Sequence, residues 1–242
     1  ATELGFSKVG FARAEQLTTE AELLKTWLSN AYHGGMEWMS KNLEQRIDTK
    51  KNFPEVKSII VGAFNYYTDY QYPSDKNALK ISRYALGEDY HTVIKRKLDA
   101  LLRFIKEKDP TAEGKTYVDS GTVMEKAWAR RAGLGWVGKN TIMNSREFGS
   151  WFFLGVLLLN IELDSTKPIK DYCGSCNRCI DACPTHALVA PYVLDARKCI
   201  SYLTIEHKGD VVASLSEKFD NWIFGCDICQ DVCPWNKKFA AM

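Results

Sequence analysis

Eight cysteines constrain this sequence more than any other feature, because every one of them lies after residue 172. The first run, "CGSCNRCIDACP" at residues 173–184, has the spacing C-x2-C-x2-C-x3-C and ends in proline. The second run, "CDICQDVCP" at residues 226–234, also ends in Cys-Pro but has one cysteine fewer, and Cys199 lies between the runs. The C-terminal part of the chain must therefore fold around whatever these thiols form or bind.

Three kinds of site use cysteines in such numbers: disulfides, zinc sites and iron-sulfur clusters. A disulfide framework would be spread along a secreted chain, whereas the larger N-terminal part has no cysteine and no signal-peptide pattern opens the sequence. Zinc ribbons rarely have a third cysteine two residues further on and a proline behind the last one, although two tetrahedral zinc sites stay the alternative. The observed spacing is typical of bacterial 4Fe-4S ferredoxins.

The ferredoxin rule also divides the ligands between two clusters. In that pattern three cysteines of a run bind one cluster, and the fourth binds the other. The first set then has three cysteines of the first run and one of the second: Cys173, Cys176, Cys179 and Cys233. The second set has the remaining four: Cys226, Cys229, Cys199 and Cys183. Two clusters with exchanged ligands lie close together, so electrons can pass between them.

Composition and hydropathy limit the class of protein. The chain is 45% hydrophobic and 26% charged, which suits a folded protein with a real core. Its net charge of +2 argues neither for nor against a nucleic-acid partner. The longest apolar run, residues 151–161, has the length of a buried strand and not of a membrane span. We therefore expect a cytoplasmic monomer with no membrane partner.

The N-terminal part alternates predicted helices and strands. Helical spacing covers residues 20–32 and 90–109, and buried strands are expected at 56–67, 115–119 and 151–161. Thr122 and Glu125 have the spacing of a capping box, which predicts a helix over residues 122–133. We expect an α/β (α+β) domain with a mixed sheet over residues 1–164. A ferredoxin-like domain with two 4Fe-4S clusters is expected over residues 165–242, after a polar linker.

Familiar cofactor motifs are missing from the sequence, but a family resemblance is strong. There is no G-x-G-x-x-G and no P-loop, and Ile94 occupies the glycine position of a D-x-H-x-x-G cobalamin loop. Long segments in order nevertheless resemble the epoxyqueuosine reductases, relatives of the reductive dehalogenases. These segments are "YHGGMEWM" (32–39), "SRYALGEDYH" (82–91), "VDSG" (118–121), "RAGLGWVGKNT" (131–141), "GSWFFLGVLLLN" (149–160), "CGSCNRCIDACPTHAL" (173–188), "CISYLTIE" (199–206) and "FGCDICQDVCPWN" (224–236).

The resemblance implies an activity and its cofactors. Such enzymes reduce the epoxide of epoxyqueuosine to the alkene of queuosine at the wobble position of tRNA. They use a cobalamin held in the N-terminal domain and two 4Fe-4S clusters, fed by an external low-potential electron donor. Asp119 matches the family's proton donor, and enclosure beside a corrin would raise its pKa so that it holds a proton near neutrality. From the residues alone, a cap of the turn into the following helix is the commoner role for an aspartate such as Asp119.

Further cofactor contacts are implied by position in the resembling segments. These residues are Arg46, Ser82, Asp119, Asn140, Met143, Ser145, Leu154, Ser201, Leu203 and Asp227. Tyr84 and His91 are plausible pocket residues, although a buried hydrogen-bonded role is the commoner one. The lower cobalt ligand cannot be read from the sequence.

The substrate leaves only a weak signal. An anticodon loop would need phosphate contacts, for which Lys170, Arg178, Lys198, Lys208, Lys237 and Lys238 are candidates, and a flipped base would stack on Trp38, Tyr66 or Tyr67. Two rival functions stay open. One is a cobalamin-dependent reductase of a halogenated or other small substrate, and the other is a two-cluster electron-transfer module that docks on a separate enzyme.

Overall fold

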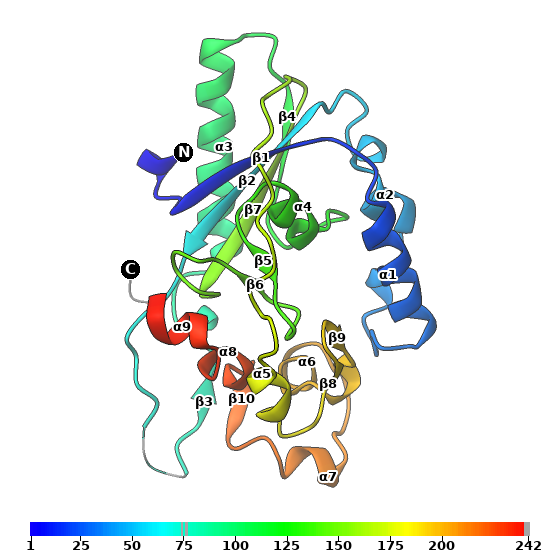
Figure 1. Ribbon diagram of the computed structural model, residues 1–242, viewed down its shortest axis with the longest axis vertical. Helices are drawn as coiled ribbons and strands as arrows, with labels where there is room; N and C mark the ends of the chain where they lie inside the picture. The colour runs from blue at the N-terminus through cyan, green and yellow to red at the C-terminus, as the bar shows by residue number, and fades with distance from the viewer. Residues whose placement is uncertain (74, 76, 240–242) are drawn as a thin grey trace.

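A central antiparallel sheet organises the larger part of the molecule (Figure 1). The computed structural model describes residues 1–73, 75 and 77–239. Within them, the largest sheet has the strand order β1 (Lys8–Arg13), β2 (Ser58–Asn65), β7 (Phe152–Leu159) and β4 (Gly114–Tyr117). Every neighbouring pair in it is antiparallel, with Val61 opposite Val156 at the centre of the β2–β7 pair.

The two central strands are apolar on both faces because helices cover both faces (Figure 1). On one side, Ile60 of β2 and Leu157 of β7 pack with the apolar stripe of α3 (Tyr90–Lys108). On the other side, Ile59 and Val61 pack with Trp128 of α4 (Glu125–Arg131). Alternate residues of a strand point to opposite faces, so continuous apolar runs read as strands buried on both sides.

The other elements are shorter and several surround the cysteines. The remaining α-helices are α1 (Thr18–Ser29), α2 (Leu43–Ile47), α5 (Arg178–Asp181), α6 (Ile200–Ile205), α7 (Ala213–Ser216), α8 (Ile228–Asp231) and α9 (Pro234–Phe239). The remaining strands are β3 (Lys80–Ile81), β5 (Trp136–Val137), β6 (Met143–Asn144), β8 (Leu188–Ala190), β9 (Val193–Leu194) and β10 (Trp222–Phe224). The 3-10 turns are η1 (Thr2–Leu4), η2 (Glu37–Met39), η3 (Thr49–Lys51), η4 (Arg83–Ala85) and η5 (Ala196–Lys198).

A small parallel pairing joins the two halves of the chain. β3 pairs with β10, so that Lys80 lies opposite Trp222. The expected mixed sheet thus divides in two: the main sheet is antiparallel throughout, and the parallel pairing occurs only between β3 and β10 among the described strands. The expected α/β class is confirmed, while the division at residue 164 stays a prediction. No helix among the described residues is long and apolar enough to cross a bilayer.

Most elements of the N-terminal part match their predicted ranges, but the capping box is wrong. Helix α4 begins at Glu125 after Met124, and no side chain caps it. The Thr122 hydroxyl donates to Asn52 Oδ1 at 2.7 Å, and Glu125 accepts instead from the backbone N–H of Asp119 at 2.6 Å. Strand β1 was not predicted from the sequence.

Candidate functional site

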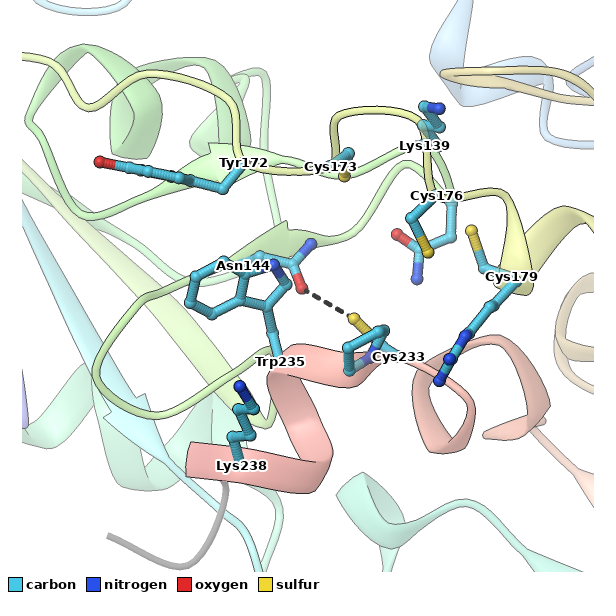
Figure 2. Close-up of a pocket in the computed structure, with 12 residues that line it drawn as sticks. Lys139, Asn144, Tyr172, Cys173, Cys176, Cys179, Cys233, Trp235 and Lys238 are labelled. Atoms are coloured by element: carbon cyan, nitrogen blue, oxygen red, sulfur yellow. Dashed lines mark hydrogen bonds between the residues drawn. The ribbon is translucent and has the colours of Figure 1, made fainter.

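The first set of cysteines lines one cavity of about 280 Å³. Cys173 and Cys176 come from the segment leading into α5, Cys179 lies within α5, and Cys233 comes from the turn before α9. Figure 2 shows their sulfur atoms facing a common space between these segments. The Cys233 thiol donates to Asn144 Oδ1 at 3.7 Å. The folded chain therefore brings together three cysteines of the first run and one of the second.

The second set also converges, at the inner side of the first. Cys226 interacts electrostatically with Cys199 and Cys183, and Cys229 interacts with all three of them. Cys183 additionally accepts a hydrogen bond from the backbone N–H of Ala187 at 3.3 Å. Cys229 also interacts with Cys179 of the first set, so the two groups of thiols are neighbours.

All eight thiols are free of disulfides. Burial raises the pKa of Cys226 to about 12 and raises the pKa of Cys229 well above its usual value. These thiols must therefore lose protons to a metal before they can act as ligands. Among the described residues, no three His, Cys, Asp or Glu side chains are placed to hold a single metal ion. The size of the first cavity suits a polynuclear cluster, which spreads its cysteines further apart than one zinc ion with Zn–S distances of about 2.3 Å.

Asp227 ties the second set to the N-terminal part of the chain. Its buried carboxylate accepts hydrogen bonds from Ser82 Oγ at 2.8 Å, Tyr72 Oη at 2.7 Å and the Arg83 backbone N–H at 2.9 Å. The Arg83 guanidinium lies between the rings of Tyr72 and Trp151, each 5.0 Å away. Two residues predicted as cofactor contacts, Ser82 and Asp227, thus bond to each other.

Asp119 lies on a tight turn two residues beyond β4, and three groups fix this turn. Asp119 has φ of 50°, in the left-handed region that few residues other than glycine adopt. Its backbone N–H donates to Glu125, and its carboxylate accepts a short hydrogen bond from the Tyr90 hydroxyl. The Arg46 guanidinium donates to the carbonyl oxygen of Gly121 at 3.3 Å. The carboxylate is therefore held in one place.

The surroundings of Asp119 are aromatic and carry perturbed groups. The Tyr90 ring stacks on Phe153 at 4.1 Å, and Tyr84 lies edge-on to both rings. Burial, followed by the charges of Asp119 and Asp227, raises the pKa of Tyr84 to about 12. Burial also raises the pKa of Glu125 to about 8, so this carboxyl exchanges its proton near neutral pH. His91 is more exposed, and its Nδ1 lies 2.7 Å from Asp89 Oδ1.

The other predicted contacts are spread over several elements. Arg46 is buried, donates to the Trp38 carbonyl at 2.9 Å and has a buried Nε without a partner among the described residues. Asn140 donates to the Cys229 carbonyl at 3.4 Å, and the buried Ser145 hydroxyl donates to Glu147. Met143 and Leu154 belong to the core on the α4 side of the sheet, whereas Ser201 and Leu203 lie on α6 directly after Cys199.

Tyr90 and Glu125 hydrogen-bond to Asp119, but sequence reasoning did not assign either of them to the site. Tyr90 is 29 positions from Asp119 in the chain, and only the fold brings them together. Glu125 was assigned to a helix cap. The sequence feature that could have indicated its contact with Asp119 is the spacing of six residues between them, across a turn that contains glycine. Arg46, which the sequence did suggest as a cofactor contact, donates to the Gly121 carbonyl of the Asp119 turn.

The folded chain defines an iron-sulfur protein: an α/β domain presents a clamped carboxylate beside two convergent sets of four cysteines. Residues 172–236 match the family described as a 4Fe-4S double cluster binding domain, and residues 46–120 match the family described as epoxyqueuosine reductase QueG. An epoxyqueuosine reductase of Cyclobacterium marinum is 48% identical over 238 residues, covering 98% of this chain and 77% of that protein. One of Leadbetterella byssophila is 49% identical over 236 residues with the same coverage. The chain belongs to the epoxyqueuosine reductase family.

Solved structures agree with this assignment. The epoxyqueuosine reductase of Streptococcus thermophilus superposes with a TM-score of 0.91 at 36% identity, covering 99% of this chain and 65% of that one. A structure of the enzyme with an epoxyqueuosine-modified tRNA stem loop has a TM-score of 0.91 at 37% identity, covering 98% and 63%. The chain thus spans about three quarters of the curated relatives and under two thirds of these solved chains. A reductive dehalogenase with 17% sequence identity superposes with a TM-score of 0.60, which shows only that the two proteins share a fold.

Proposed function

We propose that this chain reduces the epoxide of epoxyqueuosine in tRNA to the alkene of queuosine, using two 4Fe-4S clusters and a cobalamin. The observation that carries the proposal is the clamped Asp119 carboxylate beside two crossed cysteine sets, in a member of the epoxyqueuosine reductase family. A relative has been solved with an epoxyqueuosine-modified tRNA stem loop, which supports the same substrate class here. The protein acts in the cytoplasm as a monomer, and an external low-potential donor supplies its electrons.

The reaction sets what the protein must deliver. Epoxide plus two electrons and two protons gives alkene plus water, so the enzyme must supply electrons singly and protonate the departing oxygen. Cobalamin, when bound, supplies a cobalt centre that can accept single electrons and act on the carbon–oxygen bond. The protein's own part is to bind, orient, exclude water and hold protons.

The eight cysteines hold the clusters in the crossed arrangement. Cys173, Cys176, Cys179 and Cys233 bind the outer cluster, while Cys226, Cys229, Cys199 and Cys183 bind the inner one. The charge interaction between Cys179 and Cys229 supports a short distance between the two sites. Tyr84 interacts electrostatically with both Asp227 and Asp119, which supports an inner cluster on the side of the carboxylate.

Asp119 gives a proton to the departing oxygen. Tyr90 fixes its carboxylate by a hydrogen bond, and Glu125 fixes its backbone. A solved relative from Bacillus subtilis is described with an aspartate catalytic loop swung out of the active site, and it is 36% identical to this chain. By analogy, the turn that carries Asp119 is a part that must be held in place for the reaction.

The residues around Asp119 fit a large flat cofactor with amide edges. Tyr84 offers aromatic surface, whereas Phe153 and His91 already stack on the Tyr90 ring at 4.1 and 4.0 Å. The buried Nε of Arg46 is a donor without a partner among the described residues. Arg46, Asn140, Met143, Ser145, Leu154, Ser201 and Leu203 stay proposed contacts. The Ser82 hydroxyl donates a hydrogen bond to Asp227 Oδ1, so a cofactor contact from either residue would use atoms outside this hydrogen bond.

The stacking candidates for the substrate base differ in exposure. Trp38 is 47% exposed, with the Arg46 guanidinium 5.4 Å from its ring. Tyr66 instead packs against Phe153 at 4.4 Å, and Tyr67 lies 6.4 Å from the Trp151 ring. Trp38 is therefore the best placed of the three to meet a flipped base.

Anaerobic turnover tests the function. The protein is reconstituted with iron, sulfide and cobalamin, supplied with a low-potential reductant and an epoxyqueuosine-containing anticodon stem-loop, and the nucleosides are analysed by mass spectrometry. We expect the substrate to lose the mass of one oxygen atom, and only when cobalamin is present. No conversion by protein that holds both clusters and cobalamin would contradict the substrate, and a halogenated aromatic would then be the next substrate to test.

A further inference from the structure

We infer that the surface around the outer cysteine set docks an acidic one-electron carrier protein. The inference rests on the proposed function in one respect, namely that Cys173, Cys176, Cys179 and Cys233 hold a cluster. It adds the place where electrons reach the chain and the chemistry of the partner that brings them.

Cationic side chains surround the outer cavity. Lys139, Arg178 and Lys238 line it together with the four cysteines. Two more cations flank the ring of Tyr172, which also lines the cavity: Arg146 lies 5.1 Å and Lys170 5.3 Å from that ring. We call the four exposed members, Arg146, Lys170, Arg178 and Lys238, the cationic rim.

The charge of the rim is not neutralised from within the chain. None of its four members forms an ion pair with another residue that the structure describes. Among the nearby acids, Asp231 pairs with Arg83. Asp171 accepts only from neutral groups, the Tyr192 hydroxyl and the Cys173 backbone N–H, and Asp181 of α5 is exposed, so these two acids offset only part of the charge of the four cations. The rim therefore presents net positive charge at the surface.

Apolar surface lies inside this ring of charge. Tyr172 and Trp235 both line the cavity, and the two rings lie 5.7 Å apart. Each also packs against the buried Trp136. Figure 2 shows the Trp235 ring close to Cys233, the Tyr172 ring further from the sulfur atoms, and Lys238 below Trp235. A small apolar centre with a charged rim is the usual form of a transient docking surface, and electron-transfer encounters are among the smallest of these.

The position of the rim favours an electron carrier over tRNA. Electrostatic interactions link Cys179 of the outer set to Cys229 of the inner set, and Tyr84 to both Asp227, which lies between Cys226 and Cys229, and Asp119. The substrate base must reach Asp119, at one end of this series, whereas the cationic rim surrounds the other end. Opposite charge steers a carrier to the site, raising the association rate without requiring tight binding.

Charge reversal tests the inference with matched controls. Arg178→Glu and Lys238→Glu, singly and together, reverse charge at the rim. Arg103→Glu and Lys108→Glu make the same change in net charge on the last turns of α3, far from α5 and α9 (Figure 1). Because Arg178 lies between two cysteines, iron and sulfide contents are measured first, and Lys238→Glu alone serves if the Arg178 variant loses iron.

The probe is a plant-type 2Fe-2S ferredoxin, an acidic low-potential one-electron carrier. We measure its dissociation constant from the holoprotein by calorimetry in the oxidised state. We also follow bleaching of the 4Fe-4S absorption after mixing with reduced ferredoxin, which gives one electron per encounter as its own cluster is oxidised. Neither measurement needs epoxyqueuosine, so failure of the proposed turnover and failure of docking are separate results.

We expect the double rim variant to raise the dissociation constant at least about tenfold at low salt and to slow cluster reduction about as much. The difference from wild type should shrink as salt is added, and dithionite should reduce all variants alike. Equal effects of the rim and α3 variants would overturn the inference. So would loss of anticodon stem-loop affinity in the rim variants with ferredoxin binding intact, which would assign the surface to RNA.

Discussion

At the scale of single residues, the proposed function predicts that turnover depends most on Asp119. Asp119→Asn keeps the size and hydrogen-bonding shape of the side chain but removes the ionisable proton. We expect turnover to fall about 100-fold or more, the usual contribution of general acid catalysis, with clusters and cobalamin retained. Anaerobic single-turnover assays measure this, and the exposed Asp164→Asn is the control. An Asp119→Asn enzyme with wild-type turnover would show that the proton comes from elsewhere.

Glu125 makes a prediction about pH. Its pKa rises from an ordinary 4.5 to about 8 in the folded protein because the carboxyl is buried. Between these two values the folded state holds a proton that the unfolded state has lost, so the free energy of unfolding decreases as pH rises from about 4.5 to about 8. Above that window both states are ionised and the effect is constant.

Glu125→Gln removes this titration while keeping an oxygen that can accept from the Asp119 N–H. We expect the variant to gain stability relative to wild type as pH rises through the window. Thermal unfolding of the two holoproteins at matched pH values measures the difference, which isolates this one group. A difference that stays flat from pH 5 to 8 would mean that Glu125 ionises normally.

At the scale of elements, the pattern of apolar residues predicted the helices and strands whose burial depends on neighbouring residues in the sequence. The apolar runs of β2 and β7 and the stripe of α3 could be predicted, since both faces of a buried strand and one face of a helix must be apolar. Strand β1 was missed because its pattern is weak, and its Gly10 is needed for a tertiary reason. A Cβ atom there would lie 1.9 Å from the Ala132 carbonyl oxygen, a contact invisible in the sequence.

The capping box failed for a similar reason. Thr122 and Glu125 have the correct spacing, but tertiary partners compete for both side chains. Asn52 takes the threonine hydroxyl and the Asp119 turn takes the glutamate. Residues that hold the Asp119 turn and the neighbouring Asn52 therefore have, in the sequence, the spacing of a helix start.

The Asp227 contacts join two elements distant in the chain, and they predict how firmly the inner cluster is held. Asp227 lies between Cys226 and Cys229, and its partners Ser82 and Arg83 lie at the start of η4. Asp227→Ala leaves buried donors unsatisfied, which typically costs about 1–3 kcal/mol for each group. We expect the variant to release iron to a chelator at least about tenfold faster than wild type.

Two further variants separate the causes of that effect. Ser82→Ala removes one neutral donor and should speed iron release only slightly, because a single hydrogen bond contributes about 1 kcal/mol. Asp181→Ala removes an exposed acid on α5 and should leave the rate unchanged. Iron release is followed by the absorbance of the chelate. Equal rates for Asp227→Ala and Asp181→Ala would contradict a clamping role.

At the scale of the whole molecule, the cysteine pattern predicted an arrangement that no local element contains. The spacing of the runs and one rule about the fourth cysteine were enough to sort eight thiols into two sets. The fold brings the same sets together, with Cys233 in the cavity of the first run. The Asp119 surroundings were not predictable in this way, because Tyr90 and Arg46 reach the turn through the packing of α3 and α2, and no spacing rule connects them.

The crossing of ligands gives a prediction that separates it from the simpler alternative of one cluster per run. If the sets are crossed, Cys233→Ala damages the outer cluster although it lies in the second run, and Cys183→Ala damages the inner one although it lies in the first. Each variant should keep one intact 4Fe-4S cluster and convert or lose the other, with a lower iron content. Cys176→Ala is the matched control for Cys233→Ala, because both cysteines line the outer cavity.

Electron paramagnetic resonance of the reduced proteins distinguishes the two arrangements. Crossed ligation predicts that Cys233→Ala and Cys176→Ala give the same spectrum, that of the remaining inner cluster. Ligation by separate runs predicts instead that Cys233→Ala resembles Cys229→Ala. The wild-type spectrum should show magnetic interaction between neighbouring clusters, and either single-site variant should remove it. Electrons that enter at the exposed outer cluster must pass this junction, so the same two variants should also stop turnover while leaving cobalamin bound.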